Sequence, residues 1–550
     1  MQVAPWQQAA QRAQAYRDAS IAAIVPSLPA VPKDLPQNVT VLPQQLLSPR
    51  EVEITELLPE ELLPALTSGQ LSSVDVTSAF LRRAGLAQQL VNCVTEVMAP
   101  QALERARYCD EYLAEHGRPI GPLHGLPISV KEHIGMKGMT QNCAFVAWID
   151  QVAKEDAFIL TLLHNAGAVF YVRTTEPQLL MHLETASNLY GTTVNPYNRA
   201  LTSGGSSGGE GALLGLKGSC LGIGTDIGGS IRSPAANNGV WGFRPSSYRL
   251  PLGGAHAPGL GGEQIIPVIG PLSTSLAGLN VFMKTLIDQK PWLSDPSMVR
   301  LKWNTSESHL VQRHGQKKLK VAIMWHDGVV KPHPPVTRAL TEMASELKKT
   351  PGIEVVDWIP HKHDEGWDII SSLYFCASAK EDTDIIEAGG EPWLPLSKFI
   401  LLEQPGVPKE EDTASIIWVK TIRREAFKAE YAAHWNATGS ADGHPVDVIL
   451  CPVGPGAAPP LEHSRYWAYT STWNLLDYPA MVFPYSQVDQ DKDHAEAGYA
   501  PMNEQDDWNY KLYSPERYVD APISLQLVGR RYEDEKVFEA MELIKVAVGL

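Results

Sequence analysis

The sequence predicts an α/β fold with a mixed, mostly parallel central sheet that helices cover on both faces. From residue 126 onward, short runs of β-branched residues alternate with helical patterns, as in proteins whose helices connect the strands of one sheet. These strand-like runs are apolar over most of their length, which is typical of strands buried on both faces. The chain has 550 residues and is 44% hydrophobic, which suffices for one large core or two domains.

The N-terminal segment 1–47 is predicted to be an arm that precedes a catalytic domain over 48–550. It begins as a Gln- and Ala-rich helix and continues with prolines at 26, 29, 32, 36 and 43. We expect the arm to wrap the body or to contact a second subunit of a homodimer. The sequence Ser48-Pro49-Arg50-Glu51 forms a capping box that opens the next helix.

Helices and strands then follow in a regular order. Helices are expected over 73–90 and 99–116, and Gly117 ends the second of these. Amphipathic helices are predicted over 156–166 and 336–349. The clearest strands are 126–130, 168–172, 319–325, 353–358, 446–451 and 523–528.

Two segments rich in glycine and serine, 202–210 and 224–232, carry the strongest functional signal. Glycine at this density lets the backbone approach a ligand closely and adopt positive φ. Each segment ends where a helix could begin, so its backbone N–H groups have no intrahelical partner. This pattern indicates an acyl-transfer site, in which a serine attacks and backbone amides bind the oxyanion.

Three other glycine-loop sites fit less well. A phosphate-binding loop requires Lys and then Ser or Thr after its last glycine, but Glu210 and Gly211 follow Gly209. A dinucleotide fingerprint is one residue shorter than 222–228. An α/β-hydrolase elbow matches GxSxG at 204–208 but requires a preceding buried strand, and the residues before it read as a loop. An esterase using Ser206 with a histidine therefore stays as an alternative.

Longer motifs give the chain a family resemblance. The run 203–245 resembles the signature of the amidase signature family, and 125–132 is similar to that family's lysine motif. Further similarity lies at 176–177, 188–196, 447–452, 474–480 and 526–530, so the core motifs fall within 123–245 and 446–531. The residues at 174–177 and 470–473 are most similar to those of fungal general amidases of the acetamidase type. The region 290–440 carries none of these motifs, and we expect it to vary the substrate pocket.

The resemblance implies a role for each residue of the site. Ser230 would be the nucleophile, Ser206 the bridging serine after a cis peptide bond, and Lys131 the terminal base. The amides of the segment 227–230 would form the oxyanion hole, from Ile227, Gly228, Gly229 and Ser230. Residues expected to brace these loops by hydrogen bonds are Ser207, Asp226 and Arg232. The expected activity is that of an amidase (EC 3.5.1.4-like) that releases ammonia or an amine from a small carboxamide, without a metal or organic cofactor.

The residues around Lys131 support the same chemistry without the family. A serine is too weak an acid to attack an amide unless a base lies within hydrogen-bond reach. Lysine can be that base only in its neutral form, which burial away from water favours. The flanking residues 126–130 read as a short apolar strand that buries Lys131 at its end.

Composition narrows the remaining function classes. The net charge of −16 and the pI near 5.5 argue against nucleic acid or anionic membranes as partners. Six cysteines without CxxC pairs indicate reduced, packed thiols. The N-terminus lacks a signal peptide pattern, so a cytoplasmic location is expected. Two further alternatives are the ammonia-releasing subunit of a glutamine-dependent amidotransferase, and a non-catalytic scaffold protein, which intact Lys131, Ser206 and Ser230 disfavour.

Overall fold

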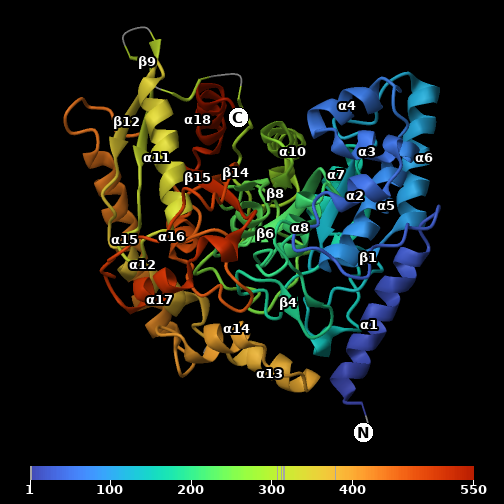
Figure 1. Ribbon diagram of the computed structural model, residues 1–550, viewed down its shortest axis with the longest axis horizontal. Helices are drawn as coiled ribbons and strands as arrows, with labels where there is room; N and C mark the ends of the chain where they lie inside the picture. The colour runs from blue at the N-terminus through green and yellow to red at the C-terminus, as the bar shows by residue number, and fades with distance from the viewer. Residues whose placement is uncertain (1–2, 306–307, 311, 314–315, 378) are drawn as a thin grey trace.

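A single large mixed sheet crosses the molecule from one side to the other (Figure 1). The computed structural model describes residues 3–305, 308–310, 312–313, 316–377 and 379–550. In this part of the chain the sheet has eleven strands. From edge to edge they are β1 (Val94–Val97), β3 (Val169–Thr174), β2 (Pro127–Lys131), β6 (Leu221–Asp226), β8 (Val268–Ser273), β7 (Trp241–Arg244), β14 (Ala480–Gln487), β15 (Pro522–Val528), β13 (Val448–Pro452), β11 (Leu319–Ile323) and β12 (Ile353–Asp357).

The strand directions confirm a mixed sheet but correct its expected balance. Parallel pairs join β3, β2 and β6 on one side and β13, β11 and β12 on the other. All the pairs between β6 and β13, and the pair of β1 with β3, are antiparallel. The sheet is therefore not mostly parallel. The central strands β6, β8, β7 and β14, which the sequence pattern did not reveal, account for most of the antiparallel pairs.

Helices pack on both faces of the sheet, as predicted, and alternating residues of β11 illustrate the two layers. Val321 and Ile323 lie in the core cluster that includes residues of α11 (Pro334–Lys349) and α18 (Asp534–Val548). Ala322 and the following Met324 lie in a second cluster with α12 (His363–Tyr374), α15 (Ala414–Ala437) and α16 (Ala468–Leu476). The remaining α-helices of the described chain are α2 (Leu42–Leu46), α3 (Pro49–Glu56), α4 (Pro59–Thr67), α5 (Ser73–Val91), α6 (Ala99–His116), α7 (Phe158–Asn165), α8 (Gly208–Gly215), α9 (Arg232–Asn237), α10 (Leu276–Asp288), α13 (Lys380–Gly389), α14 (Pro395–Lys398) and α17 (Glu504–Leu512), besides the N-terminal α1 (Pro5–Ala22).

Local signals placed several elements correctly. The Ser48 hydroxyl accepts from the Glu51 N–H and the Glu51 carboxylate accepts from the Ser48 N–H, so the predicted capping box opens α3. Gly117 adopts φ 63° and ends α6. All six predicted strands are present within two residues of their expected limits.

The N-terminal arm lies against the body. Helix α1 runs beside β1 along one edge of the molecule (Figure 1). Tyr16 donates a hydrogen bond to Glu96 of β1 at 2.9 Å, and Gln14 donates to the carbonyl of Leu189 at 2.8 Å. The arm therefore closes the β1 edge of the sheet instead of leaving that edge open to solvent.

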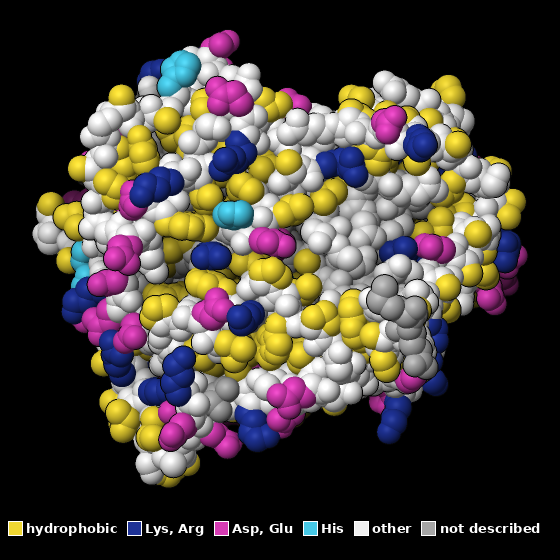
Figure 2. Space-filling view, turned by 60° about the horizontal axis from the view of Figure 1, so that its bottom comes forward, with side chains coloured by type: hydrophobic (Ala, Val, Ile, Leu, Met, Phe, Trp, Pro, Cys, Tyr) yellow, Lys and Arg dark blue, Asp and Glu magenta, His cyan; other side chains and the backbone are white. Residues whose placement is uncertain are grey.

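The cysteines are free thiols, as predicted, and five of the six are buried. Among the helices that the structure describes, none is long and apolar enough to span a bilayer. The face seen in Figure 2 carries basic and acidic side chains interspersed with apolar ones, so charges of one sign do not gather there.

Candidate active site

Strand β2 delivers Lys131 into the centre of the protein. The strand lies between β3 and β6, and every residue from Pro127 to Lys131 is buried. The Lys131 ammonium nitrogen lies 2.6 Å from Ser206 Oγ and 3.0 Å from Thr225 Oγ1. The side chain of Lys131 has no exposed surface, and Ser206 is only 2% exposed. The predicted base and the predicted bridging serine are thus hydrogen-bonded in a water-poor site.

The two glycine-rich loops meet beside Lys131. The Ser207 N–H donates to the carbonyl of Ser230 at 3.1 Å, and the Thr225 N–H donates to the Ser207 hydroxyl at 3.3 Å. The peptide bond between Gly205 and Ser206 is cis. These contacts hold the two loops together, so that Ser206 and the buried Ser230 line the same cavity. Ser207 is therefore hydrogen-bonded to both Thr225 and Ser230 of the second loop.

The local geometry does not match a hydrolase elbow. Residues 203–207 follow an irregular segment and lead into α8, so Ser206 does not stand at the end of a strand. Among the hydrogen bonds of the described residues, Ser206 is paired with Lys131, not with a histidine. This arrangement disfavours the esterase alternative.

The segment 226–231 forms a tight loop whose peptide groups are held from both sides. Asp226 accepts hydrogen bonds from the Gly229 N–H at 2.9 Å and from the Ile231 N–H at 3.1 Å. Gly229 has a φ of 131°, and a Cβ there would lie 2.3 Å from Thr470 Oγ1, so this position requires glycine. The Gly229 N–H, predicted to be an oxyanion donor, is thus directed to Asp226.

Two side chains fix the carbonyls of the same loop. Tyr374 donates to the Ile227 carbonyl at 2.5 Å, and Thr470 donates to the Gly228 carbonyl at 2.6 Å. Because the C=O and N–H of a planar trans peptide point in opposite directions, Tyr374 turns the Gly228 N–H away from itself. In the described chain the N–H groups of Ile227, Gly228 and Ser230 donate to no protein acceptor.

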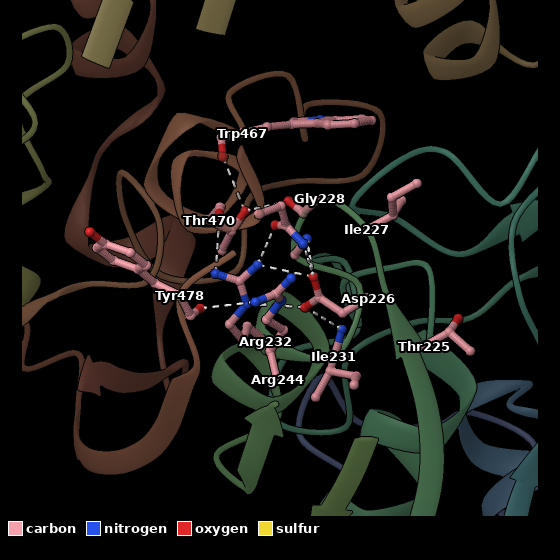
Figure 3. A network of polar contacts seen from close by, with 12 residues as sticks. Thr225, Asp226, Ile227, Gly228, Ile231, Arg232, Arg244, Trp467, Thr470 and Tyr478 are labelled. Atoms are coloured by element: carbon pink, nitrogen blue, oxygen red, sulfur yellow. Dashed lines mark hydrogen bonds and ion pairs between the residues drawn. The ribbon is translucent and has the colours of Figure 1, made fainter. Parts of the chain in front are cut away.

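A buried ion-pair network anchors this loop to α16 (Figure 3). The Arg232 guanidinium contacts both Asp226 oxygens at 3.0 and 3.1 Å and donates to the Thr470 carbonyl at 2.9 Å. Asn474 donates to Asp226 at 2.9 Å and accepts from Arg232 at 2.6 Å. Although burial raises the pKa of Asp226, Arg232 outweighs it and holds that pKa below its usual range. The Asp226–Arg232 pair therefore joins this loop to α16.

Replacing Asp226 by alanine is expected to destabilise the fold by about 3–5 kcal/mol, because it leaves the Arg232 charge buried without its partner. The Asp226 pKa is lowered in the fold, so its stabilising contribution is present above the unfolded pKa and is lost as pH falls. Denaturant unfolding at neutral pH measures the loss. The control is Asp150→Ala, since Asp150 pairs with Arg12 at 2.8 Å on the exposed surface, where such a pair contributes under about 1 kcal/mol. Equal losses in the two variants would contradict the anchoring role.

Burial sets the protonation of Lys131. Desolvation lowers its pKa to about 8, against the opposing effect of Glu176, Asp226 and Glu210. Glu176 is itself buried beside Glu132, and burial together with that neighbour raises the pKa of Glu176 well above its ordinary value. Burial and the neighbouring Glu132 therefore both favour the protonated form of the Glu176 carboxyl.

The acidic group behind Lys131 also has the composition of a metal site. Oxygen atoms of Glu132 and Glu176 and the sulfur of Cys143 lie within 4.8 Å of one another, all buried. The Glu132 carboxylate accepts from the N–H groups of Asn142 and Cys143 at 2.7 and 3.0 Å. Arg173 lies 4.0 Å from Glu132 and supplies positive charge. This carboxylate is thus already hydrogen-bonded by protein groups and lies near a positive charge, which Arg173 shares with Glu96 at 2.7 Å.

A cavity of about 530 Å³ opens beside Ser206 and Ser230. Most of its lining is apolar and comes from three segments, 179–181, 250–268 and 373–377. The last segment belongs to the region 290–440, which was expected to vary the pocket. The sequence analysis assigned no role to Thr225, Tyr374 and His133, which all border this cavity. Thr225 lies inside the glycine-rich motif, whereas nothing in the local sequence distinguishes Tyr374.

Comparisons with known proteins agree with this geometry. The family model described as Amidase matches residues 75–538. An acetamidase of Aspergillus oryzae is 39% identical over 515 residues, which cover 93% of this chain and 94% of that protein. A Schizosaccharomyces pombe protein is 47% identical over 542 residues, 98% of each chain. The solved structure of a fatty acid amide hydrolase superposes with a TM-score of 0.91 at 34% identity, covering 99% of this chain and 95% of that one.

Proposed function

The chain belongs to the amidase family, the amidase signature enzymes that act on amide bonds, and from that premise we propose that it hydrolyses carboxylic amides by a Ser230–Ser206–Lys131 relay through an acyl-enzyme. The observation that carries the proposal is the 2.6 Å contact between Lys131 Nζ and Ser206 Oγ in a fully buried site. A lysine whose pKa is lowered to about 8 has an appreciable neutral fraction near neutral pH.

The relay moves one proton in each half of the reaction. Neutral Lys131 takes the proton of Ser206 while Ser206 takes that of Ser230, and Ser230 Oγ attacks the amide carbonyl. The tetrahedral intermediate collapses when the relay returns the proton to the leaving nitrogen, which departs as ammonia or an amine. Water then attacks the acyl-enzyme by the same route and releases the acid, which restores Ser230.

The oxyanion would be bound by the backbone amides of Ile227, Gly228 and Ser230. These N–H groups donate to no acceptor in the described chain, whereas the Gly229 N–H donates to Asp226. The proposed oxyanion hole therefore has three donors and not the four that the family pattern implies. Each donor in such a site typically contributes about 2.7–4 kcal/mol.

Tyr374→Phe is expected to lower kcat by about 3- to 10-fold, the worth of one ordinary hydrogen bond. The lost hydroxyl holds the Ile227 carbonyl at 2.5 Å, and without it the Gly228 N–H is less firmly directed at the oxyanion. KM should change little, because the ring that lines the cavity is retained. Steady-state kinetics on one amide gives both constants, and a changed KM at constant kcat would instead indicate a role in binding alone.

The cavity favours an amide with an apolar acyl group. Its volume of about 530 Å³ lies within the range of about 300–1,000 Å³ usual for drug-sized ligands, and acetamide fills only a small part of it. Its described lining contains no lysine or arginine to pair with the carboxylate of glutamine. This lining disfavours the amidotransferase alternative, while the acetamidase relatives favour primary amides of short acids.

Covalent labelling tests the proposal directly. The protein would be treated with a fluorophosphonate, digested and mapped by mass spectrometry, with ammonia release measured on acetamide, hexanamide, benzamide and glutamine. An adduct on Ser230 and turnover of the apolar amides are expected. An adduct on Ser206 would move the assignment to the elbow mechanism. Ammonia from glutamine alone would favour the amidotransferase subunit, and the absence of both adduct and ammonia would favour a scaffold.

A further inference from the structure

A hydrogen-bonded chain leads from Lys131 to a histidine that takes no part in the proposed relay. Lys131 Nζ lies 3.0 Å from Thr225 Oγ1, and the same hydroxyl oxygen lies 2.9 Å from His133 Nε2. His133 Nδ1 lies 2.7 Å from the carbonyl oxygen of His256. His133, Thr225 and Lys131 are each less than a tenth exposed, so water competes little for these bonds.

The partners of His133 decide where its proton lies. The His256 carbonyl can only accept, so His133 Nδ1 carries the hydrogen. Burial and the neighbouring Lys131 hold the pKa of His133 well below its ordinary value, so the ring is neutral and Nε2 has a free lone pair. The Thr225 hydroxyl must then donate to Nε2. Its oxygen is left to accept a hydrogen from Lys131.

This direction matters for a neutral lysine, which has two N–H hydrogens and one lone pair. A Thr225 hydroxyl free to rotate could donate to that lone pair and compete with Ser206 for it. With its hydrogen bonded to His133, Thr225 can only accept, so one Lys131 N–H is tied to Thr225 and the lone pair remains available to Ser206, 2.6 Å away.

His133 is itself fixed to a wall of the cavity. Besides the bond from its ring, its carbonyl accepts from the His256 N–H at 2.9 Å. His256 lies in the loop 250–268 that lines the cavity. The backbone of His256, a residue distant in sequence, thus fixes the orientation of the His133 ring. A side chain that only fills space would not require such a hydrogen bond.

We infer that His133, acting through Thr225, is a positioning residue that keeps the lone pair of Lys131 directed at Ser206. This inference rests on the proposed function. It predicts that loss of the His133 acceptor lowers kcat without raising KM, by up to about 100-fold, the scale on which a misplaced catalytic group reduces rate.

Two substitutions at residue 133 separate the acceptor from the rest of the ring. In His133→Asn the amide can still donate to the His256 carbonyl but does not reach Thr225, so kcat is expected to fall. In His133→Gln the longer side chain places its carbonyl oxygen near the former Nε2 and can accept from Thr225, so kcat is expected to stay within a few-fold of the unmodified protein. Thermal unfolding of both variants checks that the fold is retained.

A double-mutant cycle with Thr225→Val tests the path. If His133 acts through Thr225, His133→Asn lowers kcat in the unmodified protein but has little further effect in the Thr225→Val background. Thr225→Ser, which keeps the hydroxyl, should retain most of the activity. If both His133 variants fail to fold, the comparison of kcat between Thr225→Val and Thr225→Ser is the remaining test.

The inference would be overturned by an unchanged kcat in His133→Asn, or by equally low activity of the Gln and Asn variants. It would also be overturned if His133→Asn lowered kcat equally with and without Thr225→Val. An effect confined to KM would mean instead that His133 contacts substrate. Lys131→Ala is measured in parallel. If it retains full activity, the proposed relay itself is wrong, whereas an inactive Lys131→Ala beside a fully active His133→Asn removes only the role of His133.

Discussion

Amide turnover by the Ser230→Ala variant is expected to fall by roughly 10⁶-fold, the scale on which loss of the nucleophile disables a serine hydrolase. Ser230 is 5% exposed and borders the cavity, and its loop is fixed by the bonds of Asp226 to Gly229 and Ile231. Removing one hydroxyl leaves those bonds intact, so the fold should persist. The measurement is single-turnover kinetics together with fluorophosphonate labelling, which should disappear.

Ser206→Ala is the matched control for this experiment. It removes a hydroxyl from the neighbouring loop and breaks the contact with Lys131, so kcat should fall by about 10²–10⁴-fold, the usual contribution of general acid–base catalysis. Slow labelling of Ser230 should remain in this variant. The elbow mechanism predicts the reverse, in which Ser206→Ala loses all labelling and Ser230→Ala stays active.

Lys131→Ala is expected to lower kcat at pH 7 by about 10³–10⁴-fold, with partial recovery as pH rises. The base removed by this change is the only one hydrogen-bonded to Ser206 in the described chain, and general-base catalysis contributes on this scale. Hydroxide can replace a missing base, so activity returns at alkaline pH. Rates on one amide between pH 6 and 10 check the expectation, and Lys137→Ala, on an exposed turn, is the control.

The pH profile of the unmodified protein follows from the same residue. In the proposed relay the active form of Lys131 is neutral, and burial lowers the pKa of Lys131 to about 8. Activity should therefore rise as pH increases through about 8 and then level off, and Lys131→Ala should lack this inflection. Because the folded pKa lies below that of an unfolded lysine, this group costs stability at pH values under its unfolded pKa. A profile that is flat between pH 6 and 10 would contradict a lysine base.

The sheet could be predicted at its two sides but not at its centre. Strands such as β11 and β15 carry runs of β-branched and apolar residues, and the sequence pattern placed them closely. Strand β6 carries two glycines, which weaken a strand pattern. In the fold, a Cβ at Gly222 would lie 1.9 Å from the Glu210 carboxylate. Packing of the neighbouring helix against the strand therefore requires the glycine that hides the strand from local analysis.

The site could be predicted where a motif lies in one stretch of chain. Lys131, Ser206, Asp226 and Arg232 stand in such motifs, and the fold pairs Lys131 with Ser206 and Arg232 with Asp226. The contacts of Tyr374 and His133 depend on segments more than 100 residues apart, Tyr374 with Ile227 and His133 with His256. The positions of these residues along the chain do not predict these contacts. The engagement of Gly229 by Asp226 is likewise a matter of peptide orientation, which residue identity does not encode.

The hydroxyl of Tyr374 gives the protein a constraint on how its specificity can be changed. Leu373 and Tyr374, the last two residues of helix α12, line one wall of the cavity, and this end of the helix is the natural target for redesign towards other acyl groups. The same helix also holds the Ile227 carbonyl. Selection for a new substrate that shifts α12 will therefore lower turnover of every substrate. Libraries that vary the 250–268 wall and keep Tyr374 constant can alter the substrate preference while the hydrogen bond from Tyr374 to Ile227 stays in place.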